Sequence, residues 1–305
     1  MAKISEKAVQ MPASAIRKLV PFADAAKKQG VKVYHLNLGQ PDIKSPVCAL
    51  DAVRNYSLEN VSYSHSAGLM ELRKGLVEKY YRKIGIDLTV DELIVTVAGS
   101  ESVNLALEIT CNPGDEVIAL EPFYTNYNTF AFMNGLTLKA IPTDIRNGFQ
   151  IPPIEEFEKA ITDKTKAILV CNPGNPTGTQ YSKESMLALG EIARKHDLFL
   201  LSDEVYREFC YTDEPHFSAM NIPGLEQNVV LIDSVSKRYN LCGARVGCIV
   251  SHNKDVMTAA MKFAQARLCP PVLGQMAAIG ALDTPDEYFK AVKEEYIKRR
   301  DFMIN

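Results

Sequence analysis

One lysine stands in a segment whose composition suits both covalent chemistry and phosphate binding. Lys237 follows Ser234 and Ser236, and Arg245 comes eight residues after it. A lone lysine after a strand is usually a surface charge, but a lysine near another cation and partly removed from water becomes a nucleophile able to form a Schiff base. Hydroxyls and a guanidinium are suitable donors to a phosphate. The segment therefore predicts a nucleophilic lysine beside a bound phosphate.

Three further segments place polar residues at the ends of predicted strands. Asp203 and Tyr206 follow the run LFLLS, and Asn175 lies in the loop after AILV. Ligands of open α/β sheets bind at such carboxyl ends. The stretch 96–101 leads from a strand into a helix, where free N–H groups form an anion site and Gly99 allows close approach. Taken alone, each segment is more simply explained as an ordinary turn or loop.

Together these segments resemble the class I/II aminotransferases, which are pyridoxal-phosphate (PLP) enzymes with the aspartate aminotransferase fold. The family signature Ser-x-Ser-Lys followed by Gly-x-Arg-x-Gly matches residues 234–247 throughout. The resemblance implies catalytic roles for Lys237, which forms a Schiff base with PLP, and for Asp203, which pairs with the pyridinium nitrogen. It implies that Tyr206, also catalytic, and Asn175 bind the phenolic oxygen. The residues implied for the phosphate group are Gly99, Ser100, Glu101, Ser234, Ser236 and Arg245.

Further matches complete the expected site. Tyr124 occupies the position where the family stacks an aromatic ring on PLP, whereas Tyr127 is interpreted as core packing. Gly39 matches a backbone position that faces the substrate carboxylate, and Asn175 is the second expected substrate contact. Tyr63 matches a tyrosine that reaches the phosphate in the partner subunit. The resemblance therefore implies a homodimer that binds small amino acids and 2-oxo acids.

The implied activity is ping-pong transfer of an amino group between an L-amino acid, aspartate-like or of broad range, and a 2-oxo acid. After release from the cofactor, Lys237 would move the proton at the substrate Cα. Two alternatives stay open. The trio Lys237, Asp203 and Arg245 would serve a PLP-dependent C–S or β-elimination lyase equally well. A catalytically impaired, truncated protein of the PLP fold would also retain these residues.

Apolar, strand-like runs position these segments. They recur from Leu93 onward, and several lead directly into helical patterns: residues 93–97, 117–120, 167–170, 198–202 and 229–233. Short Val, Ile and Leu runs with helices between them predict an α/β fold of three layers, with a mostly parallel sheet covered on both faces. The resemblance makes this fold type I of the PLP-dependent transferases. Near the N-terminus, the patterns predict a helix over 15–29 that stops at Gly30 and a strand over 31–38.

The chain divides into three expected parts. Residues 1–44 form an N-terminal arm and small-domain segment, 45–283 the large PLP-binding domain, and 284–305, beginning with a long helix, the start of a C-terminal small domain. Family members continue with about another hundred residues, an ordinary domain size, which carry the arginine that binds the substrate α-carboxylate. Because no position here matches that arginine, we expect a chain truncated relative to the family, with an incomplete small domain.

Composition limits the function classes. The 305 residues carry 34 Lys and Arg against 37 Asp and Glu, which provides no electrostatic footprint for nucleic acid or an anionic membrane. Seven scattered cysteines without a CxxC pair favour a reduced, cytoplasmic setting, and no histidine stands at metal-ligand spacing. The first ten residues are charged where a secretory signal needs an apolar core. We expect a cytoplasmic enzyme without metal, nucleic-acid or membrane partners.

Overall fold

The computed structural model describes residues 2–37, 39–57 and 59–304. In this part of the chain seven strands form one mixed sheet in the order β1-β7-β6-β5-β4-β2-β3. The strands are β1 (Leu93–Thr96), β2 (Glu116–Glu121), β3 (Thr137–Pro142), β4 (Thr165–Cys171), β5 (Phe199–Asp203), β6 (Val229–Ser234) and β7 (Gly247–Val250). Neighbours from β3 to β6 pair in parallel, and β7 pairs antiparallel with both β6 and β1. The predicted mostly parallel sheet is thus confirmed.

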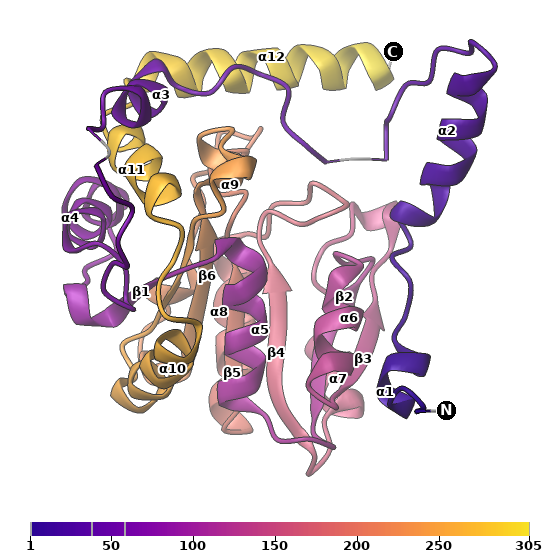
Figure 1. Cartoon of the computed structure of the whole chain (residues 1–305). Helices are drawn as coiled ribbons and strands as arrows, with labels where there is room; N and C mark the ends of the chain where they lie inside the picture. The colour runs from indigo at the N-terminus through magenta and orange to yellow at the C-terminus, as the bar shows by residue number, and fades with distance from the viewer. Residues whose placement is uncertain (1, 38, 58, 305) are drawn as a thin grey trace.

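Two apolar clusters cover the opposite faces of this sheet. Because successive side chains of a strand point to opposite faces, Leu200 and Leu231 join one cluster, while Leu201 and Val230 join the other. The second cluster includes residues of α5 (Ala98–Thr110), α6 (Asn126–Met133) and α10 (Lys254–Arg267). The first includes residues of α3 (Val47–Arg54), α4 (Met70–Gly75), α7 (Ile154–Ala160), α8 (Lys183–Lys195) and α11 (Val272–Ala281). Helices on both faces make the predicted three-layer α/β fold (Figure 1).

The N-terminal region contains α1 (Glu6–Gln10), a short 3-10 turn (Arg17–Leu19) and α2 (Val20–Lys28). The predicted helix over 15–29 is confirmed in its main part, and Gly30 with φ +81° follows its end. The predicted strand over 31–38 is wrong for residues 31–37, which form no strand. Val31, Tyr34 and Leu36 are exposed, and without a hydrogen-bonding neighbour the alternating pattern forms no strand. Leu38 lies outside the described residues.

The last helix, α12 (Asp286–Ile304), lies with the segment before α3 across the carboxyl ends of the parallel strands (Figure 1). The helix predicted from Thr284 thus begins two residues later. Arg299 Nη1 lies 2.7 Å from Asp42 Oδ1, and this exposed ion pair joins the two segments above the sheet.

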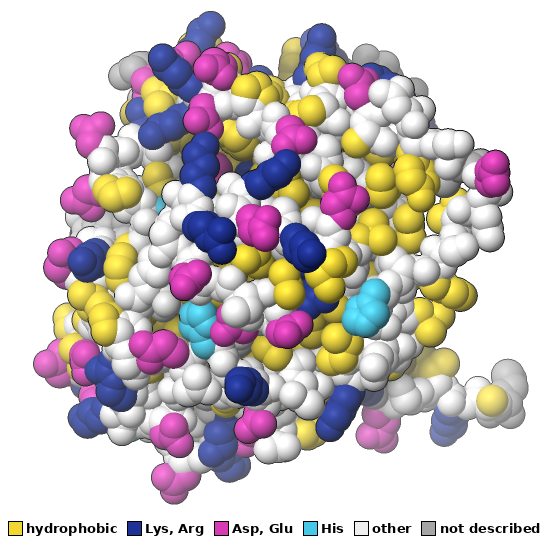
Figure 2. All heavy atoms as spheres, turned by 90° about the vertical axis from the view of Figure 1, so that its left-hand side faces the viewer, with side chains coloured by type: hydrophobic (Ala, Val, Ile, Leu, Met, Phe, Trp, Pro, Cys, Tyr) yellow, Lys and Arg dark blue, Asp and Glu magenta, His cyan; other side chains and the backbone are white. Residues whose placement is uncertain are grey.

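The surface carries charges of both signs. Figure 2 shows acidic and basic side chains interspersed over one side of the molecule, in keeping with a net charge of -3. Among the described residues, no helix combines the length and the apolar character needed to cross a membrane.

Candidate active site

Several of the predicted site residues lie at the carboxyl ends of β4, β5 and β6. A cavity of about 330 Å³ opens there. Its lining includes Gly39, Asn175, Tyr206 and Lys237, and three aromatic residues that the sequence did not single out complete one side: Phe209, Tyr211 and Tyr296. Parallel strands bring their carboxyl ends to one edge, which explains why residues far apart in sequence share this space.

Lys237 lies on the short helix α9 (Val235–Arg238), which directly continues β6. Its Nζ donates a 2.7 Å hydrogen bond to the Gly39 carbonyl and lies 5.8 Å from the centre of the Tyr206 ring. The lysine amine, the expected substrate-facing glycine and the expected cofactor-binding tyrosine therefore meet. The amine bonds to a backbone carbonyl, a neutral partner that an incoming group can replace.

Asp203, the last residue of β5, is buried. Burial raises the pKa of its carboxyl to about 6. The Tyr127 hydroxyl limits this rise by donating to Asp203 Oδ2 over 2.6 Å. A buried carboxylate with this proton affinity is suited to pair with a protonated ring nitrogen.

Tyr206 and Asn175, both expected to bind one cofactor oxygen, contact each other. Asn175 Nδ2 donates to Tyr206 Oη over 3.1 Å. Burial raises the pKa of Tyr206 well above its ordinary value, so its hydroxyl stays protonated and available as a donor. The loop after β4 and the turn after β5 thus present an amide and a hydroxyl at the same place.

Gly99, Ser100 and Glu101, which are expected to bind the phosphate, lie in the first turn of α5, and Ser234 lies beside it. Its N-cap, Val97, offers no side-chain cap, which leaves backbone N–H groups of the first turn for an anion. A Cβ added to Gly99 would lie 3.7 Å from Ser234 Cβ, so the helix start and the end of β6 are in contact. Ser236 N donates to Ser234 Oγ over 3.1 Å. Hydroxyls and free N–H groups therefore form a donor set that fits a phosphate.

The loop that follows Lys237 is shaped by the left-handed backbone of Arg245 and by the absence of a side chain at Gly247. Arg245 has the left-handed φ of +53°, and its Nη1 donates to the Cys242 carbonyl over 3.0 Å. A Cβ added to Gly247 would lie 2.7 Å from Gly99 N, a distance that real Cβ atoms essentially never show. Glycine at 247 thus permits β7 to pack directly against the helix start. The uncapped helix start and the hydroxyls beside it fit the phosphate of PLP, whereas the Arg245 side chain is exposed and bonds to the loop itself.

Three further predicted residues do not line the cavity. Glu101 Oε1 is 3.0 Å from Arg267 Nε, so its carboxylate is already paired within the chain. The Tyr124 hydroxyl accepts a 2.7 Å bond from Asn126 Nδ2. Tyr63 is 79% exposed and is not part of the cavity lining. This chain therefore does not bring Tyr63 into its own site.

Tyr127 is the main site residue that the sequence interpretation missed. It is 1% exposed, as expected of core packing, but its hydroxyl contacts Asp203. Tyr127 lies in the first turn of α6, and its ring packs edge to face against that of Tyr124, with the ring centres 5.5 Å apart. Its closeness in sequence to Tyr124 is the only signal that could have drawn attention to it.

The sheet is covered by helices on both faces, and its strand ends carry a lysine (Lys237) and a buried carboxylate (Asp203) next to a helix, α5, that begins without a side-chain cap. This arrangement is typical of the PLP-dependent transferases. The family model described as aminotransferase class I and II matches residues 31–305. The chain therefore belongs to this family and is a PLP-dependent aminotransferase by class.

Individual relatives agree with this assignment. The putative aminotransferase YugH of Bacillus subtilis is 34% identical, over 99% of this chain and 77% of its own length. The aspartate/prephenate aminotransferase of Thermus thermophilus is 31% identical, over 100% of this chain and 79% of its own length. A mutant of the Thermus thermophilus aspartate aminotransferase superposes with a TM-score of 0.93 at 31% identity, over 100% of this chain and 80% of its own. An alanine aminotransferase of Pyrococcus furiosus gives 0.92 at 33% identity, covering 99% and 78%.

Proposed function

We propose that the chain transfers the amino group of an L-amino acid, aspartate-like or of broad range, to a 2-oxo acid through covalent attachment of PLP to Lys237. The observation that carries this proposal is the position of Lys237 Nζ, which lines the cavity between Gly39 and the Tyr206 ring. The names of relatives that act on aspartate, prephenate or alanine support the substrate class.

Each residue has one task. Bound PLP supplies an electron sink for the carbanion at the substrate Cα. Lys237 Nζ would hold the cofactor and, once free, would move the proton between the substrate Cα and the cofactor carbon. Asp203, with its raised pKa, keeps a proton on the ring nitrogen. Asn175 and Tyr206 hold the ring oxygen in place.

The remaining contacts orient the two ends of the complex. Backbone N–H groups from Gly99 to Glu101 and the side chains of Ser234, Ser236 and Arg245 bind the phosphate. Tyr124 stacks on the ring. The Gly39 backbone and the Asn175 amide face the substrate carboxylate. The first 2-oxo acid leaves before the second enters the same cavity, and this order gives ping-pong kinetics.

We further propose a homodimer in which Tyr63 binds the phosphate of the partner subunit. Its 79% exposure supports this role, as does a set of exposed apolar side chains that a second copy would cover: Phe22, Tyr34, Leu36, Val61 and Phe263. We also propose that residues 1–44 form an N-terminal arm and small-domain segment, 45–283 the large PLP-binding domain and 284–305 the start of a small domain. The seven free cysteines support a reducing, cytoplasmic location.

The test is the visible spectrum of the chain with PLP, recorded before and after amino acids are added. Borohydride reduction followed by peptide mapping should place the cofactor on Lys237. Lys237→Ala should lose the bound chromophore, while Lys183→Ala, which changes an exposed lysine on α8, should keep it. Conversion of aspartate to oxaloacetate with a second 2-oxo acid, with parallel double-reciprocal plots, is the expected result. Release of pyruvate and ammonia, or a spectrum that ignores amino acids, would overturn the proposal.

A further inference from the structure

Three of the proposed cofactor residues are each followed in the sequence by a charged residue that is almost fully buried. These pairs are Asp203–Glu204, Tyr206–Arg207 and Lys237–Arg238. Glu204 is 0% exposed, Arg207 6% and Arg238 2%. Strand alternation sends Asp203 toward α6, whose Tyr127 it contacts, and Glu204 toward the opposite face. The charged partners therefore meet on the side of the sheet away from Tyr127.

On that side they form one connected set, here called the buried ion network. Its members are Glu204, Arg207, Glu208, Asp233, Arg238, Tyr80 and Tyr81. Arg238 Nη2 donates to Asp233 Oδ2 over 2.6 Å, and its Nε donates to Glu208 Oε1 over 2.9 Å. Since Asp233 belongs to β6 and Glu208 to the turn that contains Tyr206, Arg238 fixes the helix of Lys237 to both.

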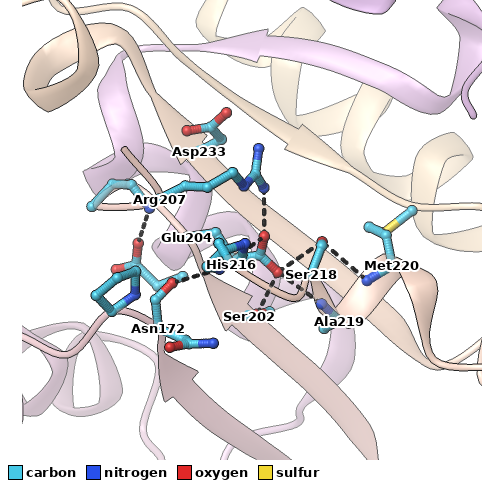
Figure 3. A network of polar contacts seen from close by, with 12 residues as sticks. Asn172, Ser202, Glu204, Arg207, His216, Ser218, Ala219, Met220 and Asp233 are labelled. Atoms are coloured by element: carbon cyan, nitrogen blue, oxygen red, sulfur yellow. Dashed lines mark hydrogen bonds and ion pairs between the residues drawn. The ribbon is translucent and has the colours of Figure 1, made fainter. Parts of the chain in front are cut away.

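Arg207 extends the network from the same turn. It donates to Glu204 at the end of β5, and its Nη1 donates to Tyr80 Oη over 3.0 Å. Glu204 Oε1 also accepts from the hydroxyls of Ser202 and Ser218, at 2.9 and 3.0 Å. Figure 3 shows these donors gathered around the Glu204 carboxylate. These bonds therefore fix the turn between Asp203 and Tyr206 from the face of the sheet opposite Tyr127.

A fourth cofactor segment is linked to the same set. His216 Nε2 lies 3.0 Å from the Asn172 carbonyl and 3.7 Å from Glu204 Oε2, so it bridges the network to the loop that carries Asn175 (Figure 3). The opposing charges are complementary, with Arg207 and Arg238 set among Glu204, Glu208 and Asp233. A buried set of this kind is weak evidence for added stability, because desolvation of the ions offsets their attraction. Its directional bonds fix geometry instead.

We propose that Arg207 and Arg238 are positioning residues of the PLP site, which set the relative placement of Asp203, Tyr206 and Lys237 from the opposite face of the sheet. This inference rests on the proposed function, because it assumes that those three residues bind PLP.

The test compares Arg238→Lys with Arg73→Lys. Lysine keeps the charge of Arg238, but a single ammonium group cannot reproduce the two directed bonds to Asp233 and Glu208. Arg73 is a matched control because it is 5% exposed and donates to the Leu93 carbonyl over 3.1 Å, outside the network. Tyr80→Phe is a second, milder network variant that removes only a hydroxyl.

Three readouts separate positioning from mere stability: the PLP dissociation constant, the visible circular dichroism of bound PLP at saturation, and the Tm without PLP. Arg238→Lys should weaken PLP binding about tenfold or more, the size of one charged hydrogen bond, and reduce the visible dichroism. Tyr80→Phe should change both in the same direction. Arg73→Lys should lower the Tm and leave both cofactor readouts unchanged.

The outcomes distinguish this inference from the proposed function. If both network variants match the parent chain in PLP affinity and visible dichroism, the network is structural and the inference is wrong. The same holds if Arg73→Lys changes the cofactor readouts as strongly as Arg238→Lys. If the parent chain itself forms no lysine-linked band with PLP, the proposed function fails and the inference falls with it. Should Arg238→Lys not fold, Tyr80→Phe alone decides.

Discussion

Asp203 and Glu204 are consecutive carboxylic acids, both buried, on opposite faces of the same strand end. Burial raises the pKa of Asp203 to about 6. Burial would also raise the pKa of Glu204, but the charge of Arg207 lowers it below the ordinary value. The difference teaches that a charged partner on one face of the sheet reverses the effect that burial has on the pKa of an acid.

The same contrast extends to the neighbouring residues. We call the side on which Asp203 contacts Tyr127 the cofactor face, and the side of the buried ion network the network face. On the cofactor face, Lys237 Nζ bonds to a backbone carbonyl and Asp203 to a tyrosine hydroxyl. On the other face, Glu204 accepts from a guanidinium, two hydroxyls and a backbone N–H. One face keeps groups ready to exchange partners with a ligand, and the other fixes the backbone that carries them.

The largest expected effect is on the cofactor face. Asp203→Asn should lower the rate of amino-group transfer about 10²–10³-fold, the loss typical of a charge-stabilising group, because an amide cannot keep a proton on the ring nitrogen. At pH 8 the free energy of unfolding should not fall, since a buried charge is removed. Steady-state kinetics and urea unfolding measure the two effects. Asp144→Asn, at an exposed acid paired with Arg146, is the control. A transfer rate within threefold of the parent would contradict the role of Asp203.

The second effect is on the network face. Glu204→Gln should lower the free energy of unfolding by about 3 kcal/mol, because it leaves Arg207 buried without its charged acceptor. Urea unfolding without PLP provides the measurement. Glu156→Gln, which breaks an exposed pair with Lys159, should cost much less, because solvent screens exposed ion pairs. Equal losses in the two variants would remove the contrast between a buried and an exposed pair.

The two acids should also give opposite dependences of stability on pH. Folded Asp203 holds its proton up to about pH 6, whereas its ordinary pKa is 3.8, so its contribution to stability is lost as pH rises through this window. Glu204 has a folded pKa below 4.5, so its contribution is lost as pH falls through that lower value. Asp203→Asn should remove the loss of stability near pH 6 in PLP-free urea unfolding, and Glu204→Gln should not. If Asp203→Asn keeps the same pH dependence of the free energy of unfolding as the parent chain, another group is responsible for the loss of stability.

The next prediction concerns Tyr127, whose hydroxyl bonds to Asp203 on the cofactor face. The hydroxyl lowers the pKa of Asp203 by donating to the carboxylate, so its removal should raise that pKa further, by about one unit for a hydrogen bond of ordinary strength. Carboxyl ¹³C NMR of the PLP-free chain reports the midpoint. Tyr181→Phe, at another buried tyrosine, is the control and should leave the midpoint in place. A midpoint that falls in Tyr127→Phe would reverse the assigned direction of the bond.

The smallest effect is expected above the cavity. Arg299→Gln removes an ion pair with Asp42 whose side chains are 43% and 68% exposed, so the free energy of unfolding should change by less than about 1 kcal/mol. Urea unfolding in low and high salt checks this, because salt should reduce the difference between variant and parent. A larger loss would mean that the segment after Gly39 depends on this contact.

Sequence reasoning found the sheet because its buried strands are continuous Val, Ile and Leu runs, such as 229–232 in β6. It missed β3, whose half-buried residues end in Pro142, and the short buried strand β7, and it predicted a strand over 31–38 from an alternating pattern that has no partner strand. An edge strand and an isolated segment have similar local patterns, and only tertiary pairing separates them.

The site shows the same division. Lys237 and Asn175 stand in motifs that are contiguous in sequence, so they could be found there. The roles of Tyr127 and Arg238 depend on contacts with groups on other elements, including Asp203 on β5 and Glu208 in the following turn. Sequence spacing does not show which groups on other elements such a side chain contacts, because those contacts form only in the folded structure.

The pairing of β1 with β7 has a consequence for how the protein is made. β1 is the first strand in the chain and β7 the last, yet Leu93 pairs with Val250 at one side of the sheet. The helix start that follows β1 is packed against Gly247 of β7. A ribosome must therefore synthesise the whole sheet-forming sequence before this half of the proposed site can close, and among the strand pairs of the sheet this one joins the residues farthest apart in sequence. We expect a nascent chain that ends before β7 to be unable to retain PLP, so that cofactor capture marks the completion of folding.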